Sequence, residues 1–367
     1  MHLVIECSAF VADLSVGDAL FGRGHGAATP TAHGPRRSAV GPRPNPDWST
    51  MEPLRVEGLE GRDLLSLADL SEVEFAGLLT SAVQLKQDWA AGIRPAYLQH
   101  KSLALVFEKP SLRTRTTFDL AMFQLGGHAV LLDQQQIGLG VRETVRDIAS
   151  NLQRWVDGIM ARTHEHATVT ALAEHAAVPV INGLSDYLHP TQVVADYITL
   201  HERFGALEGL KLTYVGDGNN VCNSHVNAAA LTGVQLTVAC PVGYEPDTQV
   251  LAAARAKGGD VRVVHDPRAA VEGADALYTD VWVSMGMEED TERRRQDFAG
   301  YTITPEWFGA LSPRGVFMHD LPAHYGEECT EEAVHHERSV VFDQAENRLH
   351  AHKAILYQLL GSEGQSL

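Results

Sequence analysis

The sequence is poor in cysteine, in basic charge and in long apolar runs. Its four cysteines are scattered over 367 residues without a C-x-x-C pair, so neither a disulfide scaffold nor a zinc ribbon is indicated. Lys and Arg number 29 against 47 Asp and Glu, which gives a formal net charge of -18. Nucleic acids and anionic membranes reward a basic face, so we expect neither as a partner. No apolar run approaches the length of a membrane span.

What is present fits a folded globular chain. Hydrophobic residues make up 44% of the sequence and charged residues 21%. The length exceeds one ordinary core, so two domains are expected. Unpaired cysteines suit a reducing compartment, and we therefore expect a cytoplasmic protein. The histidines at 164–166 and 335–336 lack the spacing of a known metal motif, so no metal site is predicted.

Residues 1–50 differ from the rest. The stretch 22–47 is dense in Gly, Pro, Ala, Thr and Arg and has no hydrophobic periodicity, which predicts a disordered extension. The first twenty residues lack the basic start, compact apolar run and cleavage site of a secretory signal. Two interpretations stay open. The segment could be a transit peptide, or the start codon could be assigned too early, since Met51 stands at the start of the predicted domain. We assign no chemistry to this segment.

From about residue 64 the pattern becomes regular. Apolar residues at three-to-four spacing predict a helix over 73–89, capped by Ser71. Strands are expected at 102–107, 128–132, 158–161, 178–181, 211–215, 234–239, 261–264, 276–279, 316–318 and 340–342. Helices are expected at 118–125, 143–155, 169–175, 189–201, 220–231, 247–256, 269–272 and 344–360. This alternation predicts parallel sheets with helices on both faces.

We therefore expect an α/β fold of two doubly wound parallel-sheet domains with an active-site cleft between them, at the carboxyl ends of the strands. Residues 51–188 would form the first domain and residues 189–343 the second. The helix over 189–201 would bridge them, and a helix within 344–362 would return to the first domain.

Residues 107–118 read F-E-K-P-S-L-R-T-R-T-T-F and stand between a predicted strand and a predicted helix. Ser111 to Thr114 would then lie at a helix amino terminus, where free N–H groups and the dipole favour phosphate. Two hydroxyls and two guanidinium groups within five residues add charge-assisted hydrogen bonds. The alternative is a capped helix with surface arginines, since Ser and Thr caps are common.

The stretch G-D-G-N-N at 216–220 also follows a strand and precedes a helix. A nicotinamide dehydrogenase would carry the full G-x-G-x-x-G pattern there, and Val221 stands in place of its third glycine. The sequence therefore disfavours a dinucleotide cofactor.

Ser111-Leu-Arg-Thr-Arg resembles the Ser-x-Arg-Thr-Arg phosphate loop of the aspartate and ornithine carbamoyltransferase superfamily, and the preceding F-E-K-P resembles its ornithine branch. The remaining motifs follow in order at Arg162, 189–192, 280–286, 319–322 and 346–348. The resemblance covers residues 64–360. It implies a cofactor-free enzyme of arginine metabolism that transfers the carbamoyl group of carbamoyl phosphate to the δ-amine of L-ornithine, giving L-citrulline and phosphate. It also implies a homotrimer.

The resemblance makes residues 51–188 the carbamoyl phosphate-binding domain and residues 189–343 the ornithine-binding domain. It gives the carbamoyl phosphate site as Ser111, Leu112, Arg113, Thr114, Arg162, His189, Gln192, Asp320, Leu321 and Arg348. It gives the catalytic residues as Arg113, Arg162, His189 and Asp320, and the ornithine site as Asn220, Asp280, Ser284 and Met285. Thr114, Arg162 and His189 would face the carbonyl oxygen, where negative charge develops. Gln192 and the Leu321 carbonyl would hold the carbamoyl NH2.

Two positions depart from the family pattern. The family's His-Cys-Leu-Pro has Asp320 in place of cysteine. A carboxylate there would raise the pKa of the acceptor amine or take its proton, so we expect an alkaline rate optimum. Many relatives place Gln or His near Gly138 and reach a neighbouring subunit; here Gln135 or Gln136 would have to substitute.

Two other functions stay open. The acceptor could be lysine, putrescine or an acylated ornithine, although Asp280 and the loop at 284–286 favour free α-amino and α-carboxylate groups. A non-catalytic paralogue that binds these ligands would bind without forming citrulline.

Overall fold

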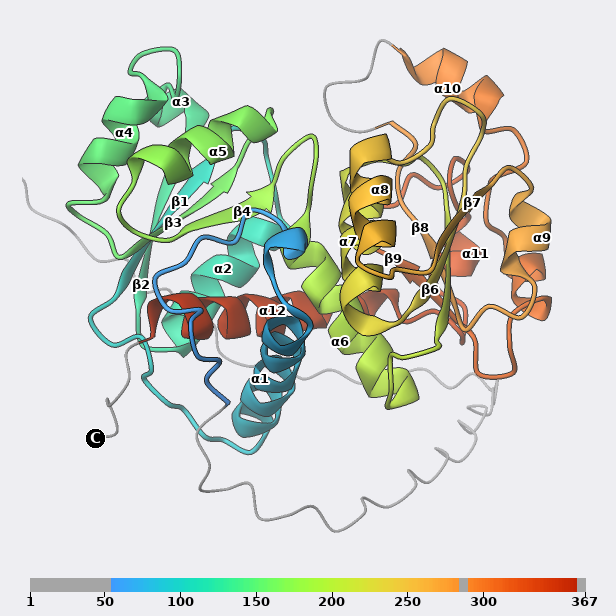
Figure 1. Cartoon of the computed structure of the whole chain (residues 1–367), viewed down its shortest axis with the longest axis horizontal. Helices are drawn as coiled ribbons and strands as arrows, with labels where there is room; N and C mark the ends of the chain where they lie inside the picture. Colours follow the sequence, from blue (N-terminus) through green and yellow to red (C-terminus); the bar gives the residue numbers. More distant parts are fainter. Residues whose placement is uncertain (1–53, 284–289, 362–367) are drawn as a thin grey trace, which may run out of the picture. The chain divides into compact units, whose positions relative to one another are not determined.

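The computed structural model describes residues 54–283 and 290–361, apart from the side chains of Gln135 and Gln136. The predicted disordered extension and the predicted roles of Ser284 and Met285 lie outside the described residues. The chain forms two parallel sheets, each flanked by helices (Figure 1). The prediction of two parallel-sheet α/β units is confirmed. We call the elements around the first sheet the first lobe and those around the second sheet the second lobe.

The first sheet has the strand order β2-β1-β3-β4. Its strands are β1 (Ser102–Phe107), β2 (His128–Asp133), β3 (Gly158–Arg162) and β4 (Val180–Leu184). Its helices are η1 (Leu67–Asp69), α1 (Glu72–Ala90), α2 (Arg113–Gln124), α3 (Gln134–Ile137), α4 (Val145–Leu152) and α5 (His166–His175). The central strands β1 and β3 are buried almost throughout. Helices cover both faces there, which explains why these strands read as continuous apolar runs.

The second sheet has the order β7-β6-β5-β8-β9. Its strands are β5 (Lys211–Val215), β6 (Gln235–Ala239), β7 (Val261–Val264), β8 (Ala276–Thr279) and β9 (Val316–His319). Its helices are α7 (Asn220–Thr232), α8 (Thr248–Ala256), α9 (Pro267–Val271), α10 (Thr291–Asp297), η3 (Pro305–Gly309) and α11 (Glu331–Val334). The strand order reverses at β5, and ligands of open α/β sheets bind outside the carboxyl ends at such a point.

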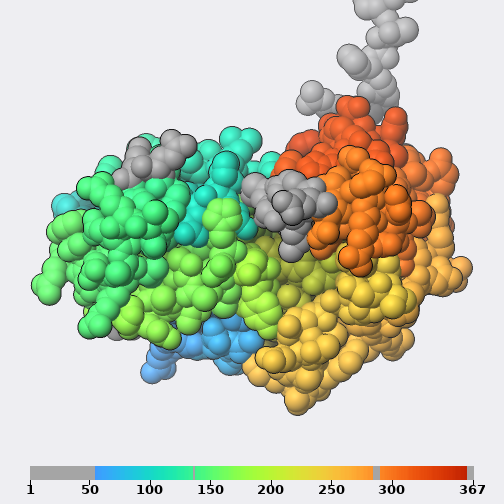
Figure 2. Space-filling model, turned by 90° about the horizontal axis from the view of Figure 1, so that it is seen from above, coloured from blue at the N-terminus to red at the C-terminus, as the bar shows by residue number. Residues whose placement is uncertain are grey.

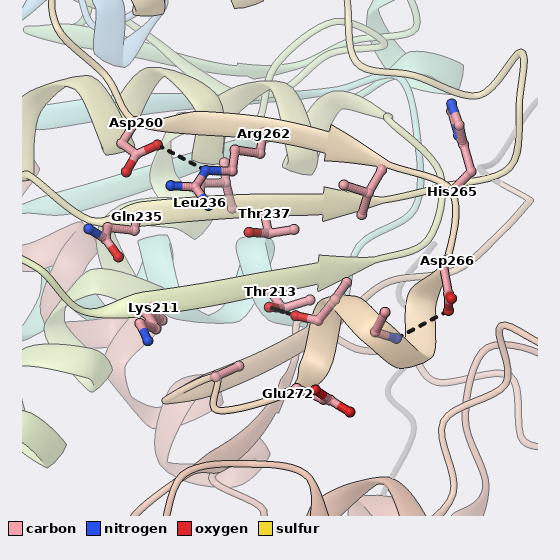
Figure 3. A pocket seen from close by; sticks show the side chains of 14 residues that line it. Lys211, Thr213, Gln235, Leu236, Thr237, Asp260, Arg262, His265, Asp266 and Glu272 are labelled. Atoms are coloured by element: carbon pink, nitrogen blue, oxygen red, sulfur yellow. Dashed lines mark hydrogen bonds and ion pairs between the residues drawn. The ribbon is translucent and has the colours of Figure 1, made fainter.

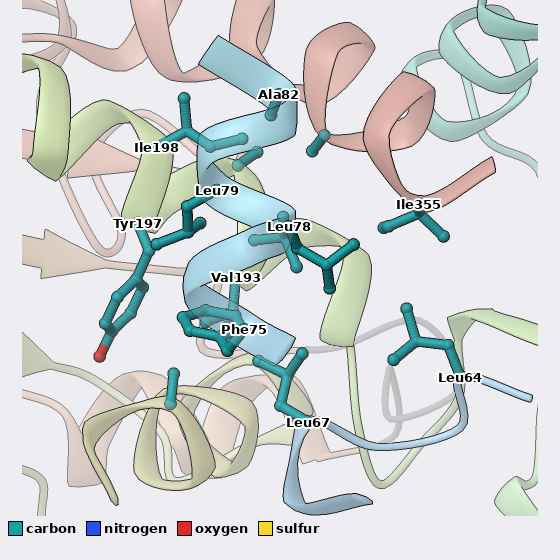
Figure 4. Close-up of a cluster of buried hydrophobic side chains, with 14 of the residues drawn as sticks. Leu64, Leu67, Phe75, Leu78, Leu79, Ala82, Val193, Tyr197, Ile198 and Ile355 are labelled. Atoms are coloured by element: carbon teal, nitrogen blue, oxygen red, sulfur yellow. The ribbon is translucent and has the colours of Figure 1, made fainter. Parts of the chain in front are cut away.

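Two long helices connect the lobes. They are α6 (Pro190–Phe204) and α12 (Val341–Leu360). In Figure 1, α12 lies against α2 and α1, and it also packs along α6. Figure 4 shows the apolar cluster at this junction, where Leu78, Tyr197 and Ile355 come from α1, α6 and α12. The apolar faces of these helices therefore share one core, which holds α12 in position against the first lobe.

The beginning of α1 shows how its sequence specifies a helix. The Ser71 hydroxyl accepts a hydrogen bond from the Glu74 N–H (3.2 Å), and the Glu74 carboxylate accepts one from the Ser71 N–H (2.7 Å). This capping box confirms the predicted start. Within residues 54–283 and 290–361, none of the helices combines the length and apolarity that crossing a bilayer requires.

The predicted strand over 340–342 is wrong. Ser339 forms only an isolated bridge to Phe317 of β9, and α12 already begins at Val341. The Val340 N–H donates to the Phe317 carbonyl (2.9 Å), so the pairing ends where the helix starts. The β-branched pair Val340 and Val341 is buried against β9 and belongs to the first turn of a helix. Propensity favoured a strand, and tertiary packing overrode it.

Candidate active site

The loop between β1 and α2 forms the first part of the candidate site. Ser111 Oγ accepts a hydrogen bond from the Thr114 N–H (3.2 Å), and α2 begins at Arg113. Thr114 is fully buried, whereas the Leu112 side chain is 75% exposed. Ser111 thus stabilises the helix start, as the capping alternative requires. Leu112 could serve a ligand only through its backbone.

Two guanidinium groups converge on Thr114 from distant parts of the chain. Arg348 of α12 donates from Nη2 to Thr114 Oγ1 (2.6 Å), and Arg162 at the end of β3 lies with Nη1 3.5 Å from the same oxygen. Both arginines are buried, and the Nε of each is a buried atom without a hydrogen-bond partner. Buried donors without acceptors are unfavourable, so the arrangement is suited to an anion that would accept from them.

The electrostatics of these arginines agree with that geometry. Burial and the nearby Arg348 lower the pKa of Arg162 to about 10. Burial also lowers the pKa of Arg348 to about 10, against the opposing effect of Asp320. Burial lowers the pKa of Arg113 as well, while Asp320 and Asp280 oppose the shift. We call Arg113, Arg162 and Arg348 the cationic group. Its mutual repulsion would be relieved by a bound dianion.

His189 and Gln192 lie at the start of α6, beside the cationic group. The His189 N–H donates to Ser224 Oγ of α7 (2.8 Å). Burial and the charges of Arg348 and Arg162 hold the pKa of His189 well below its ordinary value, so its imidazole is neutral at pH 7. A neutral imidazole can still donate one hydrogen bond. Gln192 is fully buried, and its Oε1 has no hydrogen-bond partner.

The second lobe contributes side chains from the ends of β5 and β8. Asp280 is 5% exposed, and its Oδ2 accepts from Asn219 Nδ2 (2.7 Å). Asn220 donates from Nδ2 to the Ser185 carbonyl (2.6 Å) and accepts from the Val221 N–H. Asn220 therefore ties α7 to the loop after β4. Asn219, which the sequence did not single out, is hydrogen-bonded to Asp280.

Asp320, at the end of β9, lies beside Asp280. Burial and the neighbouring carboxylate of Asp320 raise the pKa of Asp280 well above its ordinary value. Burial alone would raise the pKa of Asp320, but contacts with His319 and Asp280 lower it below its ordinary value. We call Asp280 and Asp320 the acidic pair. Two adjacent carboxylates resist ionising together, so the pair favours keeping one proton, and a bound cation would favour its loss.

His319 shows why this acidic region is a poor metal site. Asp280, His319 and Asp320 have ligand atoms within 4.8 Å of one another. Both nitrogens of His319 are already engaged, since Nδ1 accepts from the Leu321 N–H (2.9 Å) and Nε2 donates to Glu328 (3.0 Å). Leu321 also has a left-handed backbone (φ 61°), which is unusual for a branched side chain. His319 therefore shapes the turn that carries Asp320 and Leu321.

The structure brings most of the predicted residues into one neighbourhood. Hydrogen bonds or charge interactions link Thr114, Arg113, Arg162, His189, Asp280, Asp320 and Arg348. Gly138 has φ +58°, and a Cβ there would lie 2.7 Å from the Arg142 Cβ, so the backbone itself requires glycine. Figure 2 shows the first lobe (cyan and green) beside the second lobe (yellow and orange).

A hollow of about 490 Å³ on the second sheet is not the candidate site. It lies over β5, β6 and β7 beside α9 (Figure 3). None of its lining residues belongs to the predicted set. Some of its polar side chains are already paired: Arg262 lies 3.5 Å from Asp260, and Thr213 donates to the Ala270 carbonyl (2.8 Å). Unlike the cationic group, the residues that line this hollow include no group of buried donors without acceptors.

Comparison with known proteins matches both lobes to one family. Residues 62–202 match the aspartate/ornithine carbamoyltransferase carbamoyl-P binding domain, and residues 208–359 match the Asp/Orn binding domain of the same family. The chain belongs to the aspartate/ornithine carbamoyltransferase family. The family resemblance seen in the sequence motifs is thus confirmed.

Individual carbamoyltransferases resemble the chain over most of its length. Ornithine carbamoyltransferase of Deinococcus radiodurans is 54% identical over 305 residues, which are 83% of this chain and 98% of that protein. That of Thermus thermophilus is 55% identical over 299 residues, 82% of this chain and 97% of that protein. The crystal structure of ornithine carbamoyltransferase from Thermus thermophilus has 54% identity and a TM-score of 0.75, covering 81% of this chain and 98% of that one. The Pyrococcus furiosus structure has 46% identity and a TM-score of 0.80, with coverages of 83% and 99%.

Proposed function

We propose that this carbamoyltransferase transfers the carbamoyl group of carbamoyl phosphate to the δ-amine of L-ornithine, giving L-citrulline and phosphate. The observation that carries the proposal is the meeting of Arg162 and Arg348 at the buried hydroxyl of Thr114, next to a helix amino terminus. It is supported by two family domains and by relatives named for this reaction.

Carbamoyl phosphate would bind with its phosphate at the start of α2. Ser111, the Leu112 N–H, Arg113 and Thr114 would surround that position, and Arg348 would supply further positive charge. The dianion would provide the acceptors that the buried guanidinium groups lack in the free protein. It would also relieve the repulsion within the cationic group. Binding of the donor is therefore the step that neutralises this half of the site.

The chemical step is attack of a neutral amine on the carbamoyl carbon. A C–N bond forms, negative charge develops on the carbonyl oxygen, and the C–O bond to phosphate then breaks with its electron pair leaving on phosphate. Arg162, neutral His189 and Thr114 would donate to the developing oxyanion. Gln192 Oε1 and the Leu321 carbonyl would accept from the carbamoyl NH2. The attacking amine loses one proton, for which Asp320 is the proposed acceptor.

Ornithine would bind through its α-amino and α-carboxylate groups in the second lobe. Asp280 would be the countercharge for the α-ammonium, and Asn219 holds the carboxylate of Asp280 in place. Asn220, Ser284 and Met285 complete the proposed set. The arrival of an ammonium would lower the raised pKa of Asp280 and release its proton. This acceptor site consequently needs a cationic ligand as much as the donor site needs an anionic one.

The test is a citrulline assay with a panel of amines: ornithine, lysine, putrescine and N-acetylornithine. We expect a carbamoylated product from ornithine and little from the others. Arg113→Ala should reduce the rate strongly, whereas Arg146→Ala, an exposed arginine on α4, should not. Full activity of Arg113→Ala would remove the phosphate role. Product from another amine instead of ornithine would move the acceptor assignment.

The assembly and location belong to the same proposal. We propose a cytoplasmic enzyme of arginine metabolism that works as a homotrimer or a multiple of trimers. The three described cysteines, Cys222, Cys240 and Cys329, are all buried and unpaired, in keeping with a reducing compartment. Light scattering of the purified chain measures the assembly directly, and a monomeric mass would contradict the trimer.

A further inference from the structure

A buried carboxylate lies directly behind Gln192. Asp196 stands one helical turn further along α6 and is fully buried. Its Oδ1 accepts from Gln192 Nε2 (2.8 Å) and from Gln344 Nε2 of α12 (2.7 Å). Its Oδ2 lies 3.2 Å from Nε2 of His225 on α7, which is also fully buried. Three helices therefore bring nitrogen atoms to this one carboxylate.

These contacts determine which way the Gln192 amide faces. Because Asp196 Oδ1 is the acceptor of this hydrogen bond, the NH2 end of Gln192 is the end that points at Asp196. Oε1 consequently points the other way, where it is buried and has no partner. Leaving a buried carbonyl oxygen without a donor is unfavourable. The free protein thus holds a fixed acceptor that is ready for an N–H group.

The same carboxylate is connected to the end of β9. Gln344 donates to Asp196 and accepts, at Oε1, from the His319 N–H (3.0 Å). His319 Nδ1 in turn accepts from the Leu321 N–H (2.9 Å). Gln192 and Leu321, the two residues that carry the proposed acceptors of the carbamoyl NH2, therefore belong to one hydrogen-bonded network that includes Asp196.

We infer that Asp196 is a positioning residue that makes the enzyme select a carbamoyl group over other acyl groups. The inference rests on the proposed function and deepens it. Acetyl phosphate carries the same phosphate and carbonyl but has a methyl group where carbamoyl phosphate has NH2. With Gln192 held by Asp196, that methyl group leaves Oε1 buried and unpaired, which a site built for hydrogen bonding rejects strongly. Without Asp196 the amide can turn and present its own NH2 instead.

The experiment compares Asp196→Asn with the parent for three ligands of the same site. The KM of carbamoyl phosphate is measured in the citrulline assay, and acetyl phosphate and inorganic phosphate are measured as competitive inhibitors. We expect the KM of carbamoyl phosphate to rise about 10-fold or more, as loss of an oriented hydrogen bond predicts. The inhibition constants of the other two should change less than about twofold. Equal weakening of all three ligands, or no change in any, would overturn the inference.

A matched control exists on α1. There Gln84 Nε2 donates to Asp88 Oδ1 (2.8 Å) with the same four-residue spacing and with both side chains buried. Asp88→Asn removes the same kind of contact away from the site, and we expect it to leave the preference for carbamoyl phosphate over acetyl phosphate unchanged. A loss of preference in Asp88→Asn equal to that in Asp196→Asn would make the effect generic and overturn the inference.

A double-mutant cycle tests whether Asp196 acts through Gln192. Gln192→Met removes the acceptor, so adding Asp196→Asn to it should not lower the preference further. Additive losses would contradict the inference. If Asp196→Asn does not fold, Asp196→Ser gives the same comparison with a smaller side chain. A parent that shows no preference for carbamoyl phosphate and makes no citrulline would instead refute the proposed function, so the two failures are distinguishable.

Discussion

The cationic group and the acidic pair have opposite charges but share one property. Each brings like-charged side chains together without a counterion in the free protein. The cationic group draws on α2, β3 and α12 and has donors to spare, because Nε of both Arg162 and Arg348 lacks an acceptor. The acidic pair draws on the ends of β8 and β9 and resists full ionisation, because burial and its own neighbour raise the pKa of Asp280. Each half is therefore incomplete in the free protein.

The two groups differ in whether they can reduce their charge when no ligand is bound. Arginine cannot readily give up its proton, so the cationic group remains charged and stays dependent on an anion. The acidic pair can retain a proton and become partly neutral. Arg113 interacts with both carboxylates and so connects the two halves. Binding of the carbamoyl donor should therefore depend on the number of arginine charges present, whereas binding of the amine substrate should depend on pH.

The largest effect should come from removing a donor to the oxyanion. Arg162→Met keeps the length and burial of the side chain but deletes the guanidinium group. We expect kcat to fall about 100- to 1,000-fold, as for other oxyanion donors. Initial-rate citrulline assays measure this, with the exposed Arg154→Met as control. A kcat within a few-fold of the parent would contradict the proposed role of Arg162.

The second effect should be confined to the acceptor half. Asp280→Asn removes the proposed countercharge for the α-ammonium while keeping the size of the side chain. Loss of a charged hydrogen bond predicts a rise of about 10- to 100-fold in the KM of ornithine. The KM of carbamoyl phosphate, measured in the same assay, should stay nearly constant. Equal rises in both constants would show that the halves do not act separately.

The smallest effect should be a shift in pH dependence. In the proposed mechanism, Asp320 carries negative charge near the reacting amine, which would favour the ammonium form and raise the pKa of that amine. Asp320→Cys replaces it with a thiol that is largely neutral at pH 7. The rise of the rate with pH should therefore move to lower pH by about one unit. Rate profiles of parent, Asp320→Cys and the surface variant Asp260→Asn test this, and superimposable profiles would refute it.

The regular elements could be predicted because each satisfies local rules and global packing together. The buried strand β1 reads as a nearly continuous apolar run, and Ser71 with Glu74 specifies the start of α1. Val340 and Val341 were misassigned because β-branched residues favour strands, while their burial against β9 and the continuation into α12 favour a helix. Sequence pattern alone does not contain that tertiary choice.

The candidate site residues could be proposed one by one from the sequence, but their contacts with one another could not. Thr114 and Arg348 are 234 residues apart in the sequence and share a hydrogen bond. Asn219 and Asp196 were missed because one looks like a helix cap and the other like a polar residue inside an amphipathic helix. The four-residue spacing of Gln192 and Asp196 was a usable signal, since such pairs meet on one helix face. What it would not have shown is the burial that makes the contact directional.

The most direct test of the two-half account is calorimetric titration with a carbamoyl phosphate analogue whose bridging oxygen is replaced by a methylene group. The titration compares the parent with Arg162→Met, Arg348→Met and Asp280→Asn, in the absence of ornithine. We predict that each arginine variant loses about 10-fold or more in affinity, as expected for charged hydrogen bonds, while Asp280→Asn binds like the parent. Equal affinities in all four proteins would contradict the claim that the buried guanidinium groups hold the donor.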